Sequence, residues 1–117
     1  MTYEDMAANI YSAAEELEIA QVALERAVKD YAETERLYKM GRSTAYVATS
    51  GTVAEREAVV DQSISTLRYE AHLKEGLKVA ALEAVRNRRA ILSALQTLAN
   101  LSKSEADFAR TGPSYAT

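Results

Sequence analysis

The chain has 117 residues, of which 48% are apolar and 26% are charged, a composition typical of one soluble folded domain rather than of a disordered chain. It contains no cysteine, which excludes a disulfide framework, a thiolate metal site and a cysteine nucleophile. No apolar run approaches the roughly 18 residues that a membrane-spanning helix needs. The first residues include acids where a secretory signal would have bases, so we expect a cytoplasmic protein without a membrane partner.

The formal net charge of −3 is unevenly distributed along the chain. Residues 1–38 hold nine acids and three bases, whereas eleven bases and eight acids follow from Lys39 onward. The first part of the chain is therefore acidic and the remainder is basic. An anionic partner would approach the basic part.

The first predicted element is a helix over about residues 3–48. Thr2 is followed three residues later by Asp5, which is typical of a helix start. Apolar and aromatic residues then recur every seven residues, at Ile10, Leu17, Leu24, Tyr31, Tyr38 and Ala45. The companion positions are mostly alanine, threonine or glycine, so this face can approach another helix closely. We therefore expect the heptad positions to form a packing seam.

A turn is predicted at residues 49–52, because Gly51 can adopt the left-handed backbone conformation that ends a helix. Thr52 and Glu55 then form a capping box, in which each side chain accepts a hydrogen bond from the other residue's backbone amide. The turn therefore separates two helices.

The second predicted helix covers about residues 53–101, and no proline interrupts it. Leu92 and Leu95 extend the seam of the first helix. We expect an oligomer seam formed by Ile10, Leu17, Leu24, Tyr31, Leu92 and Leu95. The apolar stripe of this helix is wider than one partner helix can cover, because it includes a further group of large residues. These are Leu73, Leu77, Leu82, Ile91, Leu98 and Leu101. Residues 102–117 lose the apolar period and are predicted to form a flexible C-terminal tail.

The predicted fold class is all-α, with two long antiparallel helices forming a single helical hairpin domain over residues 1–101. A hairpin of this length buries only one side of each helix, so we expect subunits to assemble into a homo-oligomer. Kinks would fall at Gly41 and Gly76. The alternative is a monomeric bundle of four shorter helices that are broken at these two glycines.

No pattern indicates catalysis. His72 is the only histidine, whereas zinc and di-iron sites need three or four converging ligands. No phosphate-binding loop is present. The acidic cluster Glu15, Glu16 and Glu18 is typical of a solvated helix face. We expect a protein that is not an enzyme and that uses no cofactor and no metal.

A binding signal lies at the predicted bend. Lys39, Arg42, Tyr46 and Arg56 combine cations with an aromatic ring, and the first amides of the second helix add a positive helix end. Single-stranded nucleic acid is bound by this combination, because bases stack on aromatic rings while cations neutralise phosphates. The other interpretation is that the tyrosines belong to the core and that the capping box has no ligand.

A secondary basic stripe is expected on the second helix, at Lys74, Lys78, Arg86 and Arg89. Its positive charges would either contact nucleic acid or pair with the acidic first helix, within the hairpin or between subunits.

Three segments, "RLYKMGRSTAY", "TVAEREAVVD" and "RRAILSALQTL", resemble small all-helical proteins of tailed bacteriophages and, more loosely, the recombination mediator UvsY. The resemblance covers about residues 16–101. It implies an oligomer that binds single-stranded DNA and helps to load a RecA-type recombinase while single-strand binding protein is displaced. Lys39 and Arg42 are the positions that it carries over. The acidic overall charge departs from the charge expected of a strong DNA binder.

Three functions follow as hypotheses. The first is this recombination mediator, and the second is a structural or adaptor oligomer such as a virion or assembly factor. The third is an inhibitor of a host protein, in which the acidic first helix imitates nucleic acid.

Overall fold

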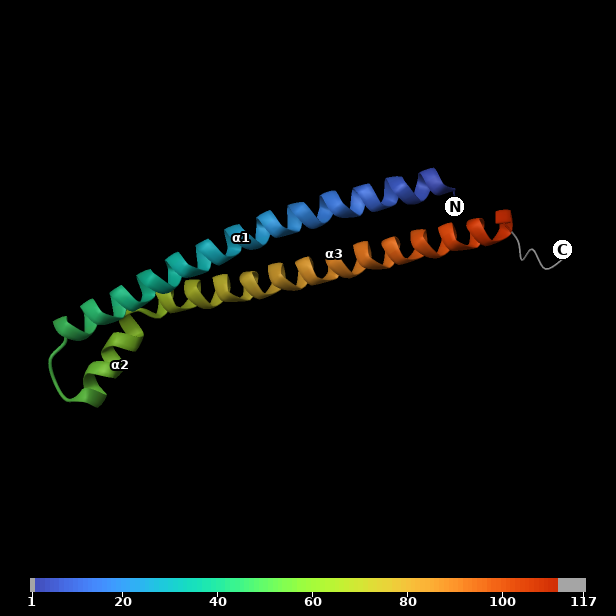
Figure 1. Ribbon diagram of the computed structural model, residues 1–117. Helices are drawn as coiled ribbons and strands as arrows, with labels where there is room; N and C mark the ends of the chain where they lie inside the picture. Colours follow the sequence, from blue (N-terminus) through green and yellow to red (C-terminus); the bar gives the residue numbers. More distant parts are fainter. Residues whose placement is uncertain (1, 112–117) are drawn as a thin grey trace. The chain divides into compact units, whose positions relative to one another are not determined.

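The computed structural model describes residues 2–111, and this part of the chain is all-α. Helix α1 covers Tyr3–Ala48, α2 covers Val53–Ser63 and α3 covers Ser65–Thr111 (Figure 1). The two long helices α1 and α3 pack antiparallel, and α2 is a short connecting helix between them. The predicted helical hairpin is confirmed.

The chain is divided into two compact units. The first, called here the terminal unit, combines α1 up to Gln21 with α3 from Ala84 onward. The second, called the bend unit, contains Val22–Glu83 and therefore holds the end of α1, all of α2 and the start of α3. Each unit is described by itself below.

The predicted helix starts are confirmed. The Thr2 amide donates to Asp5 Oδ2 and the Asp5 amide donates to Thr2 Oγ1, both at 3.1 Å. The hydrogen bond from Thr2 also lowers the pKa of the Asp5 carboxyl. Thr52 and Glu55 form the capping box of α2. Gly51 has φ of 117°, so the turn uses a backbone conformation that residues with a Cβ rarely adopt.

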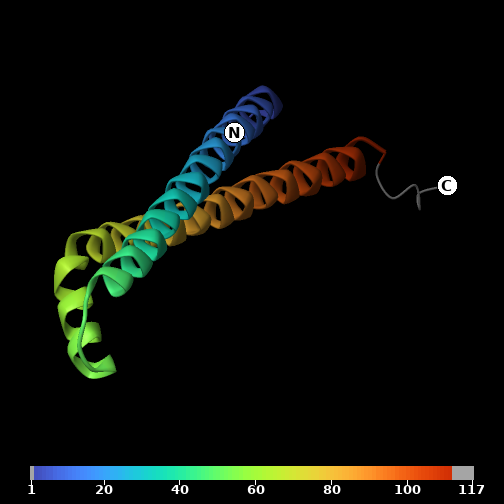
Figure 2. The same ribbon diagram turned by 90° about the vertical axis from the view of Figure 1, so that its left-hand side faces the viewer.

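The prediction of one unbroken second helix is wrong at Ile64, where α2 ends and α3 begins (Figure 2). The backbone of Ile64 has φ of −106° and ψ of 11°, outside the helical region. Ser63 Oγ donates to the Val60 carbonyl at 3.0 Å, and such side-chain hydrogen bonds compete with the helix. The break lets both Val60 and Ile64 be buried, and both are at most 4% exposed.

The predicted tail boundary is also wrong, because α3 continues to Thr111. Residues 102–111 contain no glycine or proline, and Arg110 forms an ion pair with Asp107 one turn earlier. The apolar period ends at about residue 101, but the helix continues beyond it. The remainder of the predicted tail, residues 112–117, lies outside the described residues.

The heptad positions of α1 form the face that is partly buried within the chain. Every one of them from Ile10 to Ala45 is half-buried, and Ala13, a companion position, is buried. On α3 the matching positions alternate at spacings of three and four, and we call them the inner row. They are Leu67, Ala71, Lys74, Lys78, Ala81, Val85, Arg88, Leu92, Leu95, Ala99 and Ser102.

Few side chains are buried in either unit. Among the described residues these are Ala13 and Val85 in the terminal unit, and Val60 and Ile64 in the bend unit. Each unit therefore has a thin core, because two helices cover only one face of each other.

Helix α1 continues through Gly41 and α3 continues through Gly76, so the four-helix alternative is wrong. A Cβ at Gly41 would lie 2.6 Å from Leu67 Cδ1, so this glycine permits close packing of α1 on α3. A Cβ at Gly76 would contact nothing within 4 Å.

We predict that Gly76→Ala raises the free energy of unfolding by about 0.5–1 kcal/mol, because alanine favours the helix and meets open space. Urea denaturation followed by circular dichroism measures this change. Gly41→Ala is the matched control and should gain less, since Leu67 must move to admit the Cβ. Equal gains for both variants would contradict the close approach at Gly41.

Candidate functional site

The structure places the predicted nucleic-acid contact residues in the bend unit, and each cation already has a partner there. Lys39 Nζ lies 2.7 Å from Glu35 Oε1 on the same helix. Arg42 Nη1 donates to Asp61 Oδ1 of α2 at 3.2 Å. A hydrogen bond with Tyr38 is the largest cause that raises the pKa of Arg42.

Arg56 of α2 closes the end of α1. Its guanidinium lies 4.0 Å from the centroid of the Tyr46 ring, and Nη2 donates to the Tyr46 carbonyl at 2.7 Å. That carbonyl belongs to the last turn of α1, and it also accepts a longer hydrogen bond from the Thr49 amide, at 3.4 Å. Arg56 Nε is buried without a hydrogen-bond partner among the described residues. Arg56 and Tyr46 therefore hold the bend together.

We predict that Arg56→Ala lowers the free energy of unfolding by about 1–3 kcal/mol, because it leaves the Tyr46 carbonyl without its charged donor. Thermal and urea unfolding measure the effect. Arg68→Ala is the control, since Arg68 is exposed and its removal should change stability by roughly 0.5 kcal/mol or less. If both variants have the same free energy of unfolding, the contacts of Arg56 with the end of α1 do not stabilise the protein.

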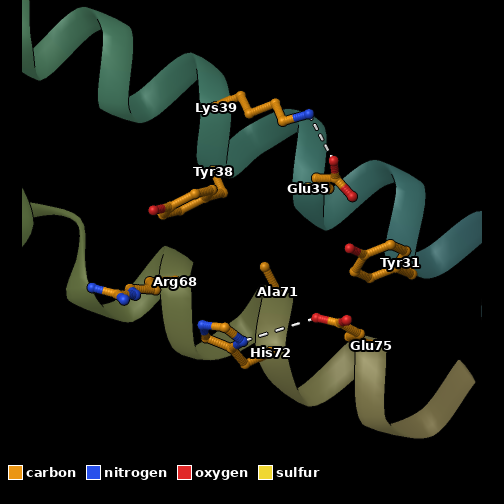
Figure 3. Close-up of a pocket in the computed structure, with 8 residues that line it drawn as sticks. All are labelled: Tyr31, Glu35, Tyr38, Lys39, Arg68, Ala71, His72 and Glu75. Atoms are coloured by element: carbon orange, nitrogen blue, oxygen red, sulfur yellow. Dashed lines mark ion pairs between the residues drawn. The ribbon is translucent and has the colours of Figure 1, made fainter. Parts of the chain in front are cut away.

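A groove lies beside these residues, and we call it the bend groove (Figure 3). Its volume is about 270 Å³. Tyr31 and Tyr38 point from α1 toward α3, and Arg68 and His72 face them from α3. The full lining consists of Tyr31, Glu35, Tyr38, Lys39, Arg68, Ala71, His72 and Glu75.

The groove combines aromatic rings with mixed charge. A hydrogen bond to Glu35 raises the pKa of Tyr31, and Lys78 Nζ lies 4.3 Å from the centroid of the Tyr31 ring. Lys39 and Tyr31 both donate to Glu35 and lower the pKa of its carboxyl. His72 Nδ1 lies 4.0 Å from Glu75 Oε2. Two carboxylates therefore oppose the cations that line the groove.

Arg68 is a cation of the bend groove that the sequence placed beside the secondary basic stripe and not among the predicted nucleic-acid contacts. It lines the bend groove, and its side chain has no hydrogen bond or ion pair with any residue in the described range 2–111, although its backbone amide donates to the Ile64 carbonyl at 3.0 Å. Because Arg68 directly follows Leu67 of the inner row, its position in the sequence could have predicted that it lies near the contact between α1 and α3. In the structure Arg42 and Arg56 are half-buried and have partners, whereas Arg68 is exposed.

The predicted secondary basic stripe does not form one exposed surface. Lys74 and Lys78 are half-buried in the inner row, whereas Arg86 and Arg89 are exposed. Pairing with the acidic first helix occurs at Arg88, which forms an ion pair with Glu16 in the terminal unit. The stripe therefore contributes partly to packing between α1 and α3.

The six residues predicted as the oligomer seam are half-buried within the chain's own units, where α1 packs on α3. They are Ile10, Leu17, Leu24, Tyr31, Leu92 and Leu95. The heptad pattern could not distinguish packing within one chain from packing between chains.

A second row on α3 has the same alternating spacing as the inner row, and we call it the outer row. Its residues are exposed, with exposed fractions of 46% for Ile91, 55% for both Leu98 and Leu101, and 63% for Phe108. In the terminal unit the row consists of Ala84, Asn87, Ile91, Ala94, Leu98, Leu101, Glu105 and Phe108. The same spacing occurs in the bend unit at Leu73, Leu77 and Ala80, which are also exposed.

Other kinds of site are not indicated within residues 2–111. In that range no group of three histidine, cysteine or carboxylate residues could hold a metal ion. No helix there is long and apolar enough to cross a membrane. Of the acidic cluster, Glu16 pairs with Arg88, and Glu15 and Glu18 are exposed.

The comparisons with known proteins add no relative. No family model matches the chain, and no curated protein or solved structure shows significant similarity to it.

Proposed function

We propose that this chain is a non-catalytic structural or adaptor protein that works in the cytoplasm as a helical homo-oligomer. The observation that carries the proposal is the outer row, an apolar face with helical spacing that no other part of the described chain covers. Exposed contiguous apolar faces of this kind mark protein interaction sites. The two thin cores also leave each unit in need of further burial.

The pairing of the bend cations supports the same proposal. Arg42 and Arg56 are engaged with Asp61 and Tyr46, so their interactions stabilise the turn between α1 and α2. An anionic ligand would have to break these contacts. The apolar outer row has no such competing partner.

We predict that the purified chain sediments as an oligomer in analytical ultracentrifugation at micromolar concentration. Leu98→Glu should shift the mass toward the monomer, because it places a carboxylate in the apolar row. Val79→Glu is the matched control, since Val79 is 51% exposed on α3 but lies outside the row. A wild-type chain that stays monomeric would contradict the proposal that the protein works as a homo-oligomer.

A second candidate is the recombination mediator that binds single-stranded DNA and assists a RecA-type recombinase, with displacement of single-strand binding protein. The bend groove favours it, because two tyrosine rings lie beside Lys39 and the unpaired Arg68. Bases could stack on the rings while the cations neutralise phosphates. Glu35 and Glu75 oppose this use, which ranks it second.

If the second candidate is right, a labelled single-stranded oligonucleotide should bind with an affinity that falls as salt rises. Arg68→Ala should reduce the slope of log affinity against log salt by about one, because one phosphate contact is lost. Lys103→Ala, an exposed cation outside the groove, serves as the control. Fluorescence anisotropy at two salt concentrations measures both variants, and no binding at low salt would exclude the mediator.

A further inference from the structure

The outer row of the terminal unit contains two polar residues, Asn87 and Glu105, among apolar ones. If another helix covers the row, both side chains lose water. A buried carboxylate without a partner is costly, and a buried amide needs hydrogen bonds. The identity of the covering helix must therefore explain these two residues.

A parallel copy of α3 in the same register does not explain them. Each residue of the row would then face its own equivalent, which places Glu105 against Glu105 of the second copy. Two carboxylates in contact repel each other. The large residues would also meet large ones at Leu98, Leu101 and Phe108, and small ones would meet small ones at Ala84 and Ala94.

An antiparallel copy of α3 resolves both difficulties in one register. When Asn87 of one chain faces Glu105 of the other, the equal spacings bring Ile91 opposite Leu101. The next pairs in each direction are Ala94 with Leu98 and Ala84 with Phe108. A large side chain therefore meets a small one at both of these layers, which is how facing helices fill space.

The charges around the two polar residues agree with this register. The Asn87 amide can donate to the Glu105 carboxylate, a charge-assisted hydrogen bond. Arg86 directly precedes Asn87 and is exposed beside the outer row, whereas Arg88 belongs to the inner row and pairs with Glu16. The contact occurs twice, because an antiparallel pair has twofold symmetry.

We propose that a second copy of this chain occupies the outer row and packs its own α3 antiparallel, with Asn87 facing Glu105 in both directions. This inference rests on the proposed function, since it names the partner and the register of the oligomer. It also gives Glu105 and Asn87 a role in selecting one register over others, as polar residues in helix seams do.

A charge exchange tests the register. Glu105→Lys should weaken self-association by roughly tenfold or more, because it removes the charge-assisted hydrogen bond from Asn87 and places a cation beside Arg86. The double variant Asn87→Asp with Glu105→Lys should restore association, since in the antiparallel register the new carboxylate faces the new ammonium group. In a parallel pair the double variant would place like charges together and would not restore it.

Disulfide trapping gives an independent measurement, because the chain has no cysteine of its own. Copies with Ala84→Cys and copies with Phe108→Cys are mixed at equal concentration and oxidised. The proposed register predicts the mixed disulfide in large excess over either symmetric one. Circular dichroism confirms that each variant keeps its helix content before oxidation.

The outcomes distinguish failure of the proposed oligomeric function from failure of the antiparallel register. A monomeric wild-type chain overturns both the oligomeric function and this interface. An oligomer whose double charge variant is not restored, or whose symmetric disulfides dominate, overturns the antiparallel register alone. Restoration together with the mixed disulfide supports it.

Discussion

Two helices that pack against each other share only one face, and this constraint governs both units of the chain. Each helix contributes one row with spacings of three and four, and everything outside that row stays in contact with solvent or with another molecule. Val85 in the terminal unit and Val60 in the bend unit are buried because they lie where the shared face is best covered. The break at Ile64 extends this cover by bringing α2 over the end of α1.

Local rules in the sequence were sufficient for the helices and caps. The heptad period of α1, the positive φ at Gly51 and the Thr52 capping box depend on neighbouring residues, and all were predicted correctly. The break at Ile64 could not be predicted, because it depends on burying Val60 and Ile64 in the bend unit at the same time. The partners Asp61 and Glu16 were missed for the same reason, since each contacts a residue on another helix.

The candidate site shows that tertiary contacts determine whether a charged side chain is available to a ligand. Arg42 and Arg68 are both basic residues of the bend unit, and spacing alone favoured Arg42. The structure engages Arg42 with Asp61 and Tyr38, whereas Arg68 faces the bend groove. A cation is available to an anionic ligand only when its folded-state partners leave it free, and that depends on which helices meet.

No rotation of α3 about its axis could bury both of its rows against α1. In the terminal unit, turning the helix by one residue would exchange Leu92 and Leu95 for Ile91 and Ala94, so one apolar row would still be left outside. Covering a leucine stabilises a structure by roughly 1.5–3 kcal/mol relative to exposure. Within one chain α1 covers one apolar row of α3, and the other row stays exposed.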